Sequence, residues 1–208
     1  MCGRFTIIAD VKTLEQRFNA IAQSSLWPHY NAAPSQLLPI ITNDQSAVIE
    51  LGRWGLQPSW LKSKSGLINT RAESIRERPT FRDALARRRC LVLADGFFEW
   101  DHQRQPYYFF LPDKQPFALA GIWESAHDSD GNILPTFAII TTEANETVAP
   151  IHNRMPVILK PDDESVWLDS KIEPDQELKL LQPYIGDLTL YPISTKVNSV
   201  KNDSPDVI

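Results

Sequence analysis

Short apolar runs, several of them alternating with polar residues, recur along most of the chain and predict a β-rich protein. Turn-forming residues separate these runs. The expected strands span residues 3–8, 37–42, 47–54, 90–100, 107–111, 117–123, 134–141, 155–159 and 188–193. Asn43-Asp44 lies between two of these segments and predicts a hairpin. Several strands in close succession after Cys90 are typical of a barrel or a sandwich.

Short helices are expected around this β-rich core. The first spans residues 11–21, where four apolar residues fall on one face and Asp10 is a suitable N-cap. Further helices are expected at residues 81–88, 162–168 and 174–181. Residues beyond Ser194 have no such pattern and are expected to form a frayed tail. The pattern therefore predicts an α+β fold, a single domain on a barrel-like core of mainly antiparallel strands with peripheral helices.

Length and composition agree with one globular domain. A chain of 208 residues, of which 42% are hydrophobic, can bury a sizeable core. Cys2 and Cys90 show no pairing pattern, and the four histidines lack metal-ligand spacing, so we expect a reducing compartment and no metal or cofactor. No secretory leader and no membrane-spanning apolar run is evident, which predicts a cytoplasmic protein, or a nuclear one in a eukaryote, without a membrane partner.

The charge is unevenly distributed. The net charge is −5, yet residues 53–90 contain ten Lys/Arg against three Asp/Glu, whereas residues 160–208 contain five against ten. A local basic patch indicates an anionic partner better than the overall charge does. The run Arg87-Arg88-Arg89 is explained equally well by a solvated helix face.

Cys2 is the first candidate for chemistry. If Met1 were removed, Cys2 would carry a free α-amine with a pKa near 7.7–8.0 beside a thiol with a pKa near 8.5, so one residue would present two nucleophiles to one carbonyl. The alternative is that Cys2 is a small residue tolerated near the chain start, since a lone cysteine is usually inert packing.

Glu99 and His152 are candidates for proton transfer. Glu99 lies between Phe98 and Trp100 in an apolar run, where alternation turns it away from both aromatic neighbours. It is either a solvent-facing strand residue or a desolvated acid with a raised pKa. His152 lies in a loop before a strand, a placement that favours function. The histidines at positions 29, 102 and 127 are expected on the surface without a partner.

Other residues suit the binding of a phosphorylated, aromatic ligand. Asn69 and Arg71 share one face of an extended segment and could hold a sugar or phosphate, and Arg4 could bind phosphate in the same way. The tryptophans at positions 54, 60 and 100 are core residues by default. Their glycine, proline and basic neighbours make base stacking on a single strand a second interpretation.

Six ordered motifs connect these residues: Cys2-Gly3-Arg4-Phe5, Tyr30-Asn31-Ala32-Ala33-Pro34, Trp54-Gly55-Leu56-Gln57-Pro58, Asn69-Thr70-Arg71-Ala72-Glu73, Gly96-Phe97-Phe98-Glu99-Trp100 and His152-Asn153-Arg154-Met155-Pro156. Together they resemble the SRAP domain family, whose members trap abasic sites in single-stranded DNA. The resemblance spans residues 1–195 and leaves residues 196–208 as a tail. Gln57 and Phe98 depart from the family pattern and bear on ligand preference.

The resemblance implies a cross-linking activity on DNA. Cys2 would form a thiazolidine with the aldehyde of an abasic site, while Asn69 orients the sugar, Glu99 shuttles protons and His152 assists ring opening. The implied DNA contacts are Arg4, Asn31, Trp54, Arg71, Glu73, Trp100, Thr142 and Arg154. The expected partner is single-stranded DNA containing abasic sites, bound by a monomer without a cofactor, in the DNA damage response and associated with the nucleoid.

Three alternatives remain at this point. Cys2 could be the nucleophile of an amidohydrolase, since one class of glutamine amidotransferases also begins Met-Cys-Gly. It could act as an autopeptidase or as part of a lyase. The chain could also bind single strands without covalent chemistry, in which case its affinity would fall steeply with salt and survive loss of Cys2.

Overall fold

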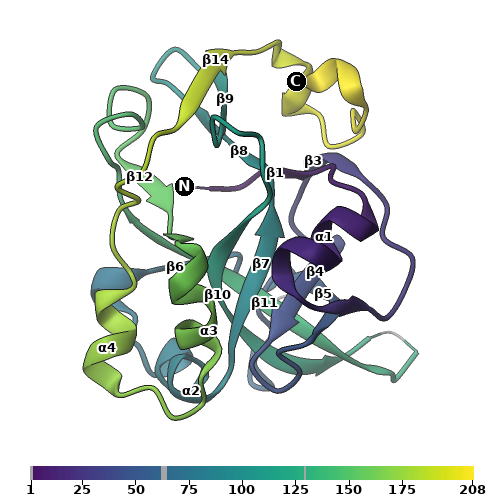
Figure 1. The fold of residues 1–208 in the computed structure, drawn as a ribbon, viewed down its shortest axis with the longest axis vertical. Coiled ribbons are helices and arrows are strands. Elements are labelled where there is room, and N and C mark those ends of the chain that lie inside the picture. Colours follow the sequence, from purple (N-terminus) through teal and green to yellow (C-terminus); the bar gives the residue numbers. More distant parts are fainter. Residues whose placement is uncertain (1, 62–64, 129) are drawn as a thin grey trace.

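The computed structural model describes residues 2–61, 65–128 and 130–208 and contains a closed five-stranded barrel (Figure 1). The barrel strands are β4 (Leu37–Thr42), β5 (Val48–Trp54), β7 (Arg89–Ala94), β10 (Phe117–His127) and β11 (Ile133–Glu143). Four neighbouring pairs are antiparallel, and a short parallel contact between β5 and β11 closes the barrel. The α+β class and the barrel-like core are confirmed, as is the hairpin at Asn43-Asp44.

Short strands extend the barrel at its edges. β2 (Ile21–Ala22) adds to β5, β6 (Asn69–Arg71) and β12 (Arg154–Pro156) add to β11, and β13 (Ile158–Leu159) adds to β10. The expected strand at 155–159 is thus two strands with different partners. β6 runs parallel to β11, so Asn69 and Arg71 lie beside Ile139 and Thr141 at one end of the barrel.

A second, five-stranded antiparallel sheet packs beside the barrel. Its order is β14 (Thr189–Pro192), β9 (Pro106–Phe110), β8 (Gly96–Trp100), β1 (Phe5–Ile7) and β3 (His29–Ala32). One face places Phe97 and Phe109 in the main core. The opposite face places Phe98, Tyr108 and Phe110 in a smaller, separate core. Strand alternation therefore divides this sheet between two cores.

The expected strand at 90–100 is wrong in one respect, because Asp95 divides it into β7 of the barrel and β8 of the second sheet. The Asp95 carboxylate accepts hydrogen bonds from the Thr6 hydroxyl and from the backbone N–H groups of Ile8 (2.6 Å) and Ala9 (3.0 Å). These bonds fasten the end of β1 to the point where the chain changes sheets. A buried acidic residue in an apolar run was the signal for this corner.

The helices lie outside the barrel (Figure 1). They are α1 (Val11–Phe18), α2 (Pro79–Arg87), α3 (Pro161–Leu168) and α4 (Pro174–Lys179), with 3₁₀ turns η1 (Ala72–Ser74), η2 (Thr195–Asn198) and η3 (Pro205–Val207). Asp10 caps α1 as expected, accepting from Thr13 N at 2.7 Å. The helix ends earlier than expected because Asn19 adopts a left-handed conformation, with φ 48°, and Ile21 joins β2.

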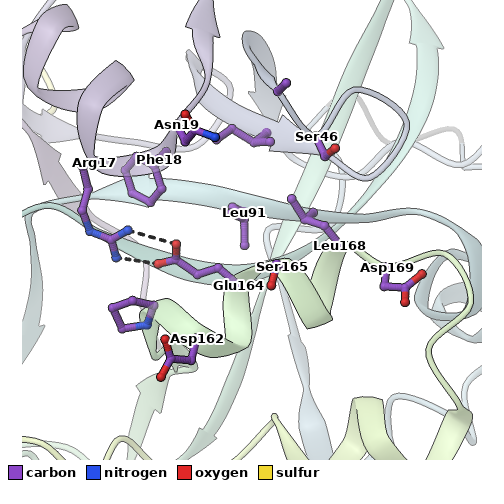
Figure 2. Close-up of a pocket in the computed structure, with 13 residues that line it drawn as sticks. Arg17, Phe18, Asn19, Ser46, Leu91, Asp162, Glu164, Ser165, Leu168 and Asp169 are labelled. Carbon is purple, nitrogen blue, oxygen red and sulfur yellow. Dashed lines mark hydrogen bonds and ion pairs between the residues drawn. The ribbon is translucent and has the colours of Figure 1, made fainter.

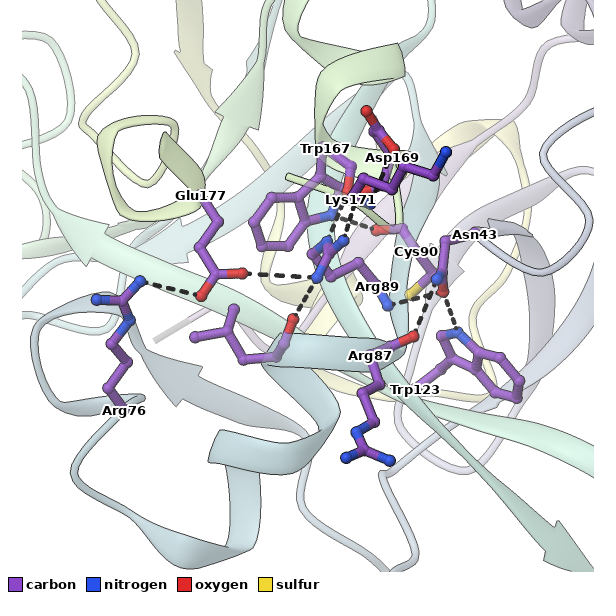
Figure 3. A network of polar contacts seen from close by, with 11 residues as sticks. Asn43, Arg76, Arg87, Arg89, Cys90, Trp123, Trp167, Asp169, Lys171 and Glu177 are labelled. Atoms are coloured by element: carbon purple, nitrogen blue, oxygen red, sulfur yellow. Dashed lines mark hydrogen bonds and ion pairs between the residues drawn. The ribbon is translucent and has the colours of Figure 1, made fainter. Parts of the chain in front are cut away.

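Arg89 holds three of these helices against the barrel (Figure 3). Its guanidinium donates to the carbonyls of Trp167 (2.7 Å), Leu85 (2.6 Å) and Asp169 (2.6 Å), and Glu177 of α4 lies 3.5 Å away. The side chain is fully buried. The run Arg87-Arg88-Arg89 is therefore only partly solvated, because Arg87 is exposed whereas Arg89 points into the protein.

The expectation of a frayed tail is wrong. Val197 and Val207 are buried in the smaller core, against the outer face of the second sheet. Asp203 binds the backbone N–H groups of Tyr30 and Asn31 and lies 2.8 Å from His29 Nδ1. His29 is therefore half-buried with an acidic partner rather than a free surface residue. The residues that hold this segment are ordinary polar residues, so composition alone did not reveal it.

Candidate active site

Four of the predicted residues meet where the second sheet adjoins the barrel. Cys2 precedes β1, and Glu99 lies in β8 next to β1. Asn69 begins β6, and His152 lies in the loop between β11 and β12. Figure 1 shows the start of the chain close to β6 and β12. The fold thus brings together residues from four separate parts of the sequence.

Cys2 is held at both its backbone and its side chain. Asn69 Nδ2 donates to the Cys2 carbonyl at 2.7 Å. The thiol lies 3.9 Å from the carbonyl oxygen of Arg4, which also accepts from Phe98 N of β8 at 3.1 Å. Burial raises the pKa of the Cys2 thiol, and the nearby charge of Glu99 raises it further. The thiol therefore keeps its proton near neutral pH.

Glu99 is a desolvated acid and not a solvent-facing strand residue. Its side chain is 2% exposed, and it faces away from Phe98, which belongs to the smaller core. Burial raises the pKa of Glu99 to about 7, so that the carboxyl group exchanges its proton close to neutral pH.

His152 lies beside Glu99, with its Nδ1 atom 3.8 Å from a carboxylate oxygen. The backbone N atom of Arg154 lies 3.0 Å from Nδ1. Nδ1 also lies 3.1 Å from the Arg154 carbonyl, to which it donates in the tautomer protonated on Nδ1 and in the charged ring. In the neutral tautomer with its proton on Nε2, Nδ1 instead accepts the Arg154 N–H. Burial lowers the pKa of His152, which favours the neutral ring.

A groove opens beside His152, with a volume of about 740 Å³. Its lining residues are Arg71, Glu143, Ala144, Ala149, His152, Asn153 and Arg154. Arg71 is exposed. The guanidinium of Arg154 donates to both oxygens of Glu73, at 2.7 and 2.9 Å, which lowers the pKa of Glu73. Arg154 is therefore already paired with a carboxylate, whereas Arg71 is presented to the groove.

Thr142 borders a neighbouring hollow of about 350 Å³ together with Glu73 and residues near α4. Its side chain is largely buried. Glu143 lines both this hollow and the groove at His152, and the Glu73–Arg154 ion pair joins a lining residue of each.

Three of the predicted DNA contacts face the C-terminal segment instead. Arg4 donates to Asn31 Oδ1 at 2.8 Å and to the carbonyls of Val197 and Asn198. Asn31 is fully buried, and Trp100 Nε1 donates to the Asn198 side chain at 2.8 Å.

Trp54 is a core residue. Its ring has no exposed surface, and its indole N–H donates to the Ile68 carbonyl at 2.9 Å. Base stacking by Trp54 is therefore not supported, whereas Trp60 is 60% exposed. Two lysines of the basic segment, Lys62 and Lys64, lie outside the described residues.

Two groups of residues that support the site were not predicted. Asn145 accepts from Val148 N at 3.0 Å and donates to the Tyr184 carbonyl at 2.9 Å, which fixes the loop that carries His152. Asn198 and Asp203 bind the residues around Arg4. An asparagine opening a turn was a usable signal for Asn145. Asn198 and Asp203, in the C-terminal segment, had no comparable signal in the sequence.

A further cavity of about 550 Å³ lies between α1, α3 and the barrel (Figure 2). The carboxylate of Glu164 faces Arg17 there, with two hydrogen bonds of 2.6 and 3.0 Å. None of its lining residues borders the groove at His152.

In the described parts of the chain, no three His, Cys, Asp or Glu residues are grouped as metal ligands. Among the same residues, no helix is long and apolar enough to span a membrane.

The chain is similar to several known proteins. The "Abasic site processing protein YoqW" of Bacillus subtilis is 41% identical over 100% of this chain and 99% of its own length. The "Abasic site processing protein HMCES" of Rattus norvegicus is 30% identical over 87% of this chain and 64% of its own. A crystal structure of a Bacteroides thetaiotaomicron protein matches with a TM-score of 0.88 and 30% identity, covering 99% of this chain and 98% of that one. The family model "SOS response associated peptidase (SRAP)" matches residues 1–200, and the chain belongs to this family.

Proposed function

We propose that this protein senses abasic sites in single-stranded DNA and forms a covalent thiazolidine cross-link through Cys2 after removal of Met1. The names of its relatives support the processing of abasic sites, and the family supports a role in the response to DNA damage. The observation that carries the proposal is the convergence of Asn69, Glu99 and His152 on Cys2. The cross-link would shield the site.

The proposed chemistry begins at the α-amine of Cys2. An abasic site in its ring-opened form is an aldehyde. The amine nitrogen attacks the aldehyde carbon, and loss of water gives an imine. The thiol sulfur then adds to the same carbon, and the S–H proton ends on nitrogen, which closes the thiazolidine ring. Tethering the thiol to the imine makes closure intramolecular, an advantage worth about 7–11 kcal/mol in well-oriented cases.

The surrounding groups suit these steps. Asn69 fixes the Cys2 carbonyl, and so orients the residue that reacts. Glu99, with a pKa of about 7, can give a proton to the departing hydroxyl and take one from the amine. In the tautomer whose Nδ1 accepts from Arg154 N, His152 presents Nε2–H and can donate to the sugar oxygen during ring opening.

The DNA backbone would follow the groove that begins at His152. Arg71 is the exposed cation there and suits a phosphate. Glu73 holds Arg154 through the ion pair, and both Glu73 and Thr142 line the neighbouring hollow, where they can border the strand.

A thiol-first amidohydrolase is a weaker candidate for this site. Such a mechanism relies on a nucleophilic thiolate, whereas burial and the charge of Glu99 raise the pKa of the Cys2 thiol. The same environment is compatible with the amine as first nucleophile and a protonated thiol as second.

Intact-protein mass spectrometry with abasic single-stranded DNA tests the proposal. We expect the mass of the chain without Met1, a covalent adduct with the loss of one water, and no adduct for Cys2→Ala. The Cys90→Ala variant is the matched control, because Cys90 lies in the barrel strand β7. Full cross-linking by Cys2→Ala, or a wild-type adduct that retains Met1, would overturn the proposal.

A further inference from the structure

The C-terminal segment, residues 195–208, packs on the sheet that carries the reactive residues. Val197 and Val207 are buried against the face formed by Phe98, Tyr108 and Phe110. The opposite face of the same sheet carries Glu99, since strand neighbours point to opposite sides. The segment therefore lies behind the candidate active site rather than in its groove.

Arg4 connects this segment to Cys2. Its Nη1 atom donates to the Val197 carbonyl at 2.7 Å and to Asn31 at 2.8 Å, and Nη2 donates to the Asn198 carbonyl at 3.2 Å. The backbone carbonyl of Arg4 is the oxygen that faces the Cys2 thiol at 3.9 Å. The guanidinium is thus held by three oxygen acceptors, two residues beyond the proposed nucleophile.

Asn31 and Asp203 form the other side of this connection. Asn31 Nδ2 lies within hydrogen-bonding distance of the carbonyls of Val197 (3.1 Å), Ser199 (3.1 Å) and Asn202 (2.8 Å). Asp203 accepts from Asn31 N at 2.9 Å. Because Asn31 is fully buried, these contacts leave it no surface for a nucleotide.

The segment also contacts the strand that carries Glu99. Asn198 Oδ1 accepts from Trp100 Nε1 at 2.8 Å, one residue beyond Glu99 in β8. Residues 195–208 therefore hold both neighbouring strands, β1 through Arg4 and β8 through Trp100.

We infer that residues 195–208 position Cys2 relative to Glu99, with Arg4 and Asn31 as positioning residues that hold the segment rather than contacts to DNA. The inference rests on the proposed cross-linking function and adds to it a part of the chain that no sequence motif marked. Arginine suits this role because its planar fork can satisfy several fixed acceptors at once, which the point charge of lysine cannot do.

The two steps of the reaction depend on this positioning to different degrees. Imine formation needs the amine and the aldehyde, and it releases water. Ring closure also needs the thiol sulfur to reach the imine carbon, with transfer of its proton to nitrogen. Since the Arg4 carbonyl faces the thiol, loosening Arg4 should slow ring closure more than imine formation.

An Arg4→Lys variant, incubated with abasic single-stranded DNA, tests this difference. The measured quantity is the partition, defined as the ratio of imine to closed-ring product. Borohydride reduces the imine to a stable amine, so complex recovered only with borohydride measures imine, and complex recovered without it measures the closed ring. We expect ring closure to slow by about tenfold or more, with imine formation changing far less. Affinity for intact single-stranded DNA should stay within about twofold, because the positive charge is kept. Asp203→Asn should shift the partition in the same direction by a smaller factor.

Lys196→Ala is the matched control, because Lys196 belongs to the same segment and its exposed side chain pairs with Asp206 on the surface. It should leave the partition unchanged, and thermal unfolding should show all variants folded at the assay temperature. If wild-type protein cross-links while Arg4→Lys keeps its rate and partition, the positioning role is wrong and the proposed function stands. If wild-type protein itself gives no ring-closed adduct, the proposed function and this inference both fall.

Discussion

Two buried polar networks in this protein differ in how their charges are balanced. Around Arg89, each guanidinium nitrogen has a carbonyl partner, and Glu177 lies nearby to compensate the charge (Figure 3). Burial lowers the pKa of Arg89, whose guanidinium nevertheless stays charged, whereas burial raises the pKa of Glu99 to about 7 and also raises that of the Cys2 thiol. The first network holds helices to the barrel. The second keeps protons that can be moved near neutral pH, which is what the proposed chemistry needs.

The largest effect on stability is expected at Arg89. Arg89→Met should lower the free energy of unfolding by about 3–5 kcal/mol, because it leaves the carbonyls of Leu85, Trp167 and Asp169 without their donor. Urea unfolding followed by tryptophan fluorescence measures this. The control is Arg87→Met, an exposed neighbour that should change stability by less than about 0.5 kcal/mol. A loss below about 1 kcal/mol for Arg89→Met would show that the network does not stabilise the fold.

Glu99→Gln should have the opposite effect on stability. The folded pKa of about 7 lies above the unfolded value, so ionisation favours the unfolded chain as pH rises toward 7. Removing the charge should therefore raise the free energy of unfolding by on the order of 3 kcal/mol at pH 8, with a much smaller gain at pH 4. Glu143→Gln, at an exposed position, is the control. Equal effects at both pH values would show that ionisation of Glu99 does not destabilise the folded protein.

The same substitution should change the pH dependence of cross-linking. Below pH 7.7–8.0 the amine is protonated, and above about 7 Glu99 has lost the proton it donates. The wild-type rate should therefore be bell-shaped, with a maximum between pH 7 and 8. In Glu99→Gln the maximum rate should fall by about 10²-fold, and only the rise with pH should remain. A Glu99→Gln profile that still declines at high pH would assign that limb to another group.

A smaller effect is expected at the groove, where Arg71 is exposed, whereas Arg89 is fully buried. Arg71→Ala should weaken binding of intact single-stranded DNA and reduce the slope of log affinity against log salt by about 0.7–1. Fluorescence anisotropy over a salt series measures both. Arg87→Ala removes an exposed arginine outside the groove lining and should leave the slope unchanged. Equal slopes for the two variants would place the strand elsewhere.

Much of the fold followed from the sequence because hydrophobic periodicity reports local burial. It predicted most of the strands and the hairpin, although not β2, β3 or β6, and it turned Glu99 away from Phe98. Periodicity could not reveal that residues 90–100 belong to two sheets, since both halves are buried. It also could not distinguish a core tryptophan from a stacking one, so the burial of Trp54 was visible only in the structure.

The candidate site was partly predictable for a different reason. Cys2, Asn69, Glu99 and His152 were chosen by chemistry and by the order of motifs, and the fold brings them together. The partners of Arg4, Asn31 and Trp100 come from residues 197–203. No pattern in this segment distinguishes polar groups that make internal contacts from those that face solvent. Contacts over such sequence separations depend on the tertiary fold, which no local pattern encodes.

The corner at Asp95 has a consequence for cooperativity. Cys2 and Glu99 belong to the second sheet, whereas Asn69 and His152 belong to the barrel, and the chain passes between the two at Asp95. The two sheets can open as separate units if their local stabilities differ. A partial opening that leaves the barrel intact would then separate Cys2 and Glu99 from Asn69 and His152. In such an opening the proposed cross-linking would be lost before the barrel strands exchange their amide hydrogens.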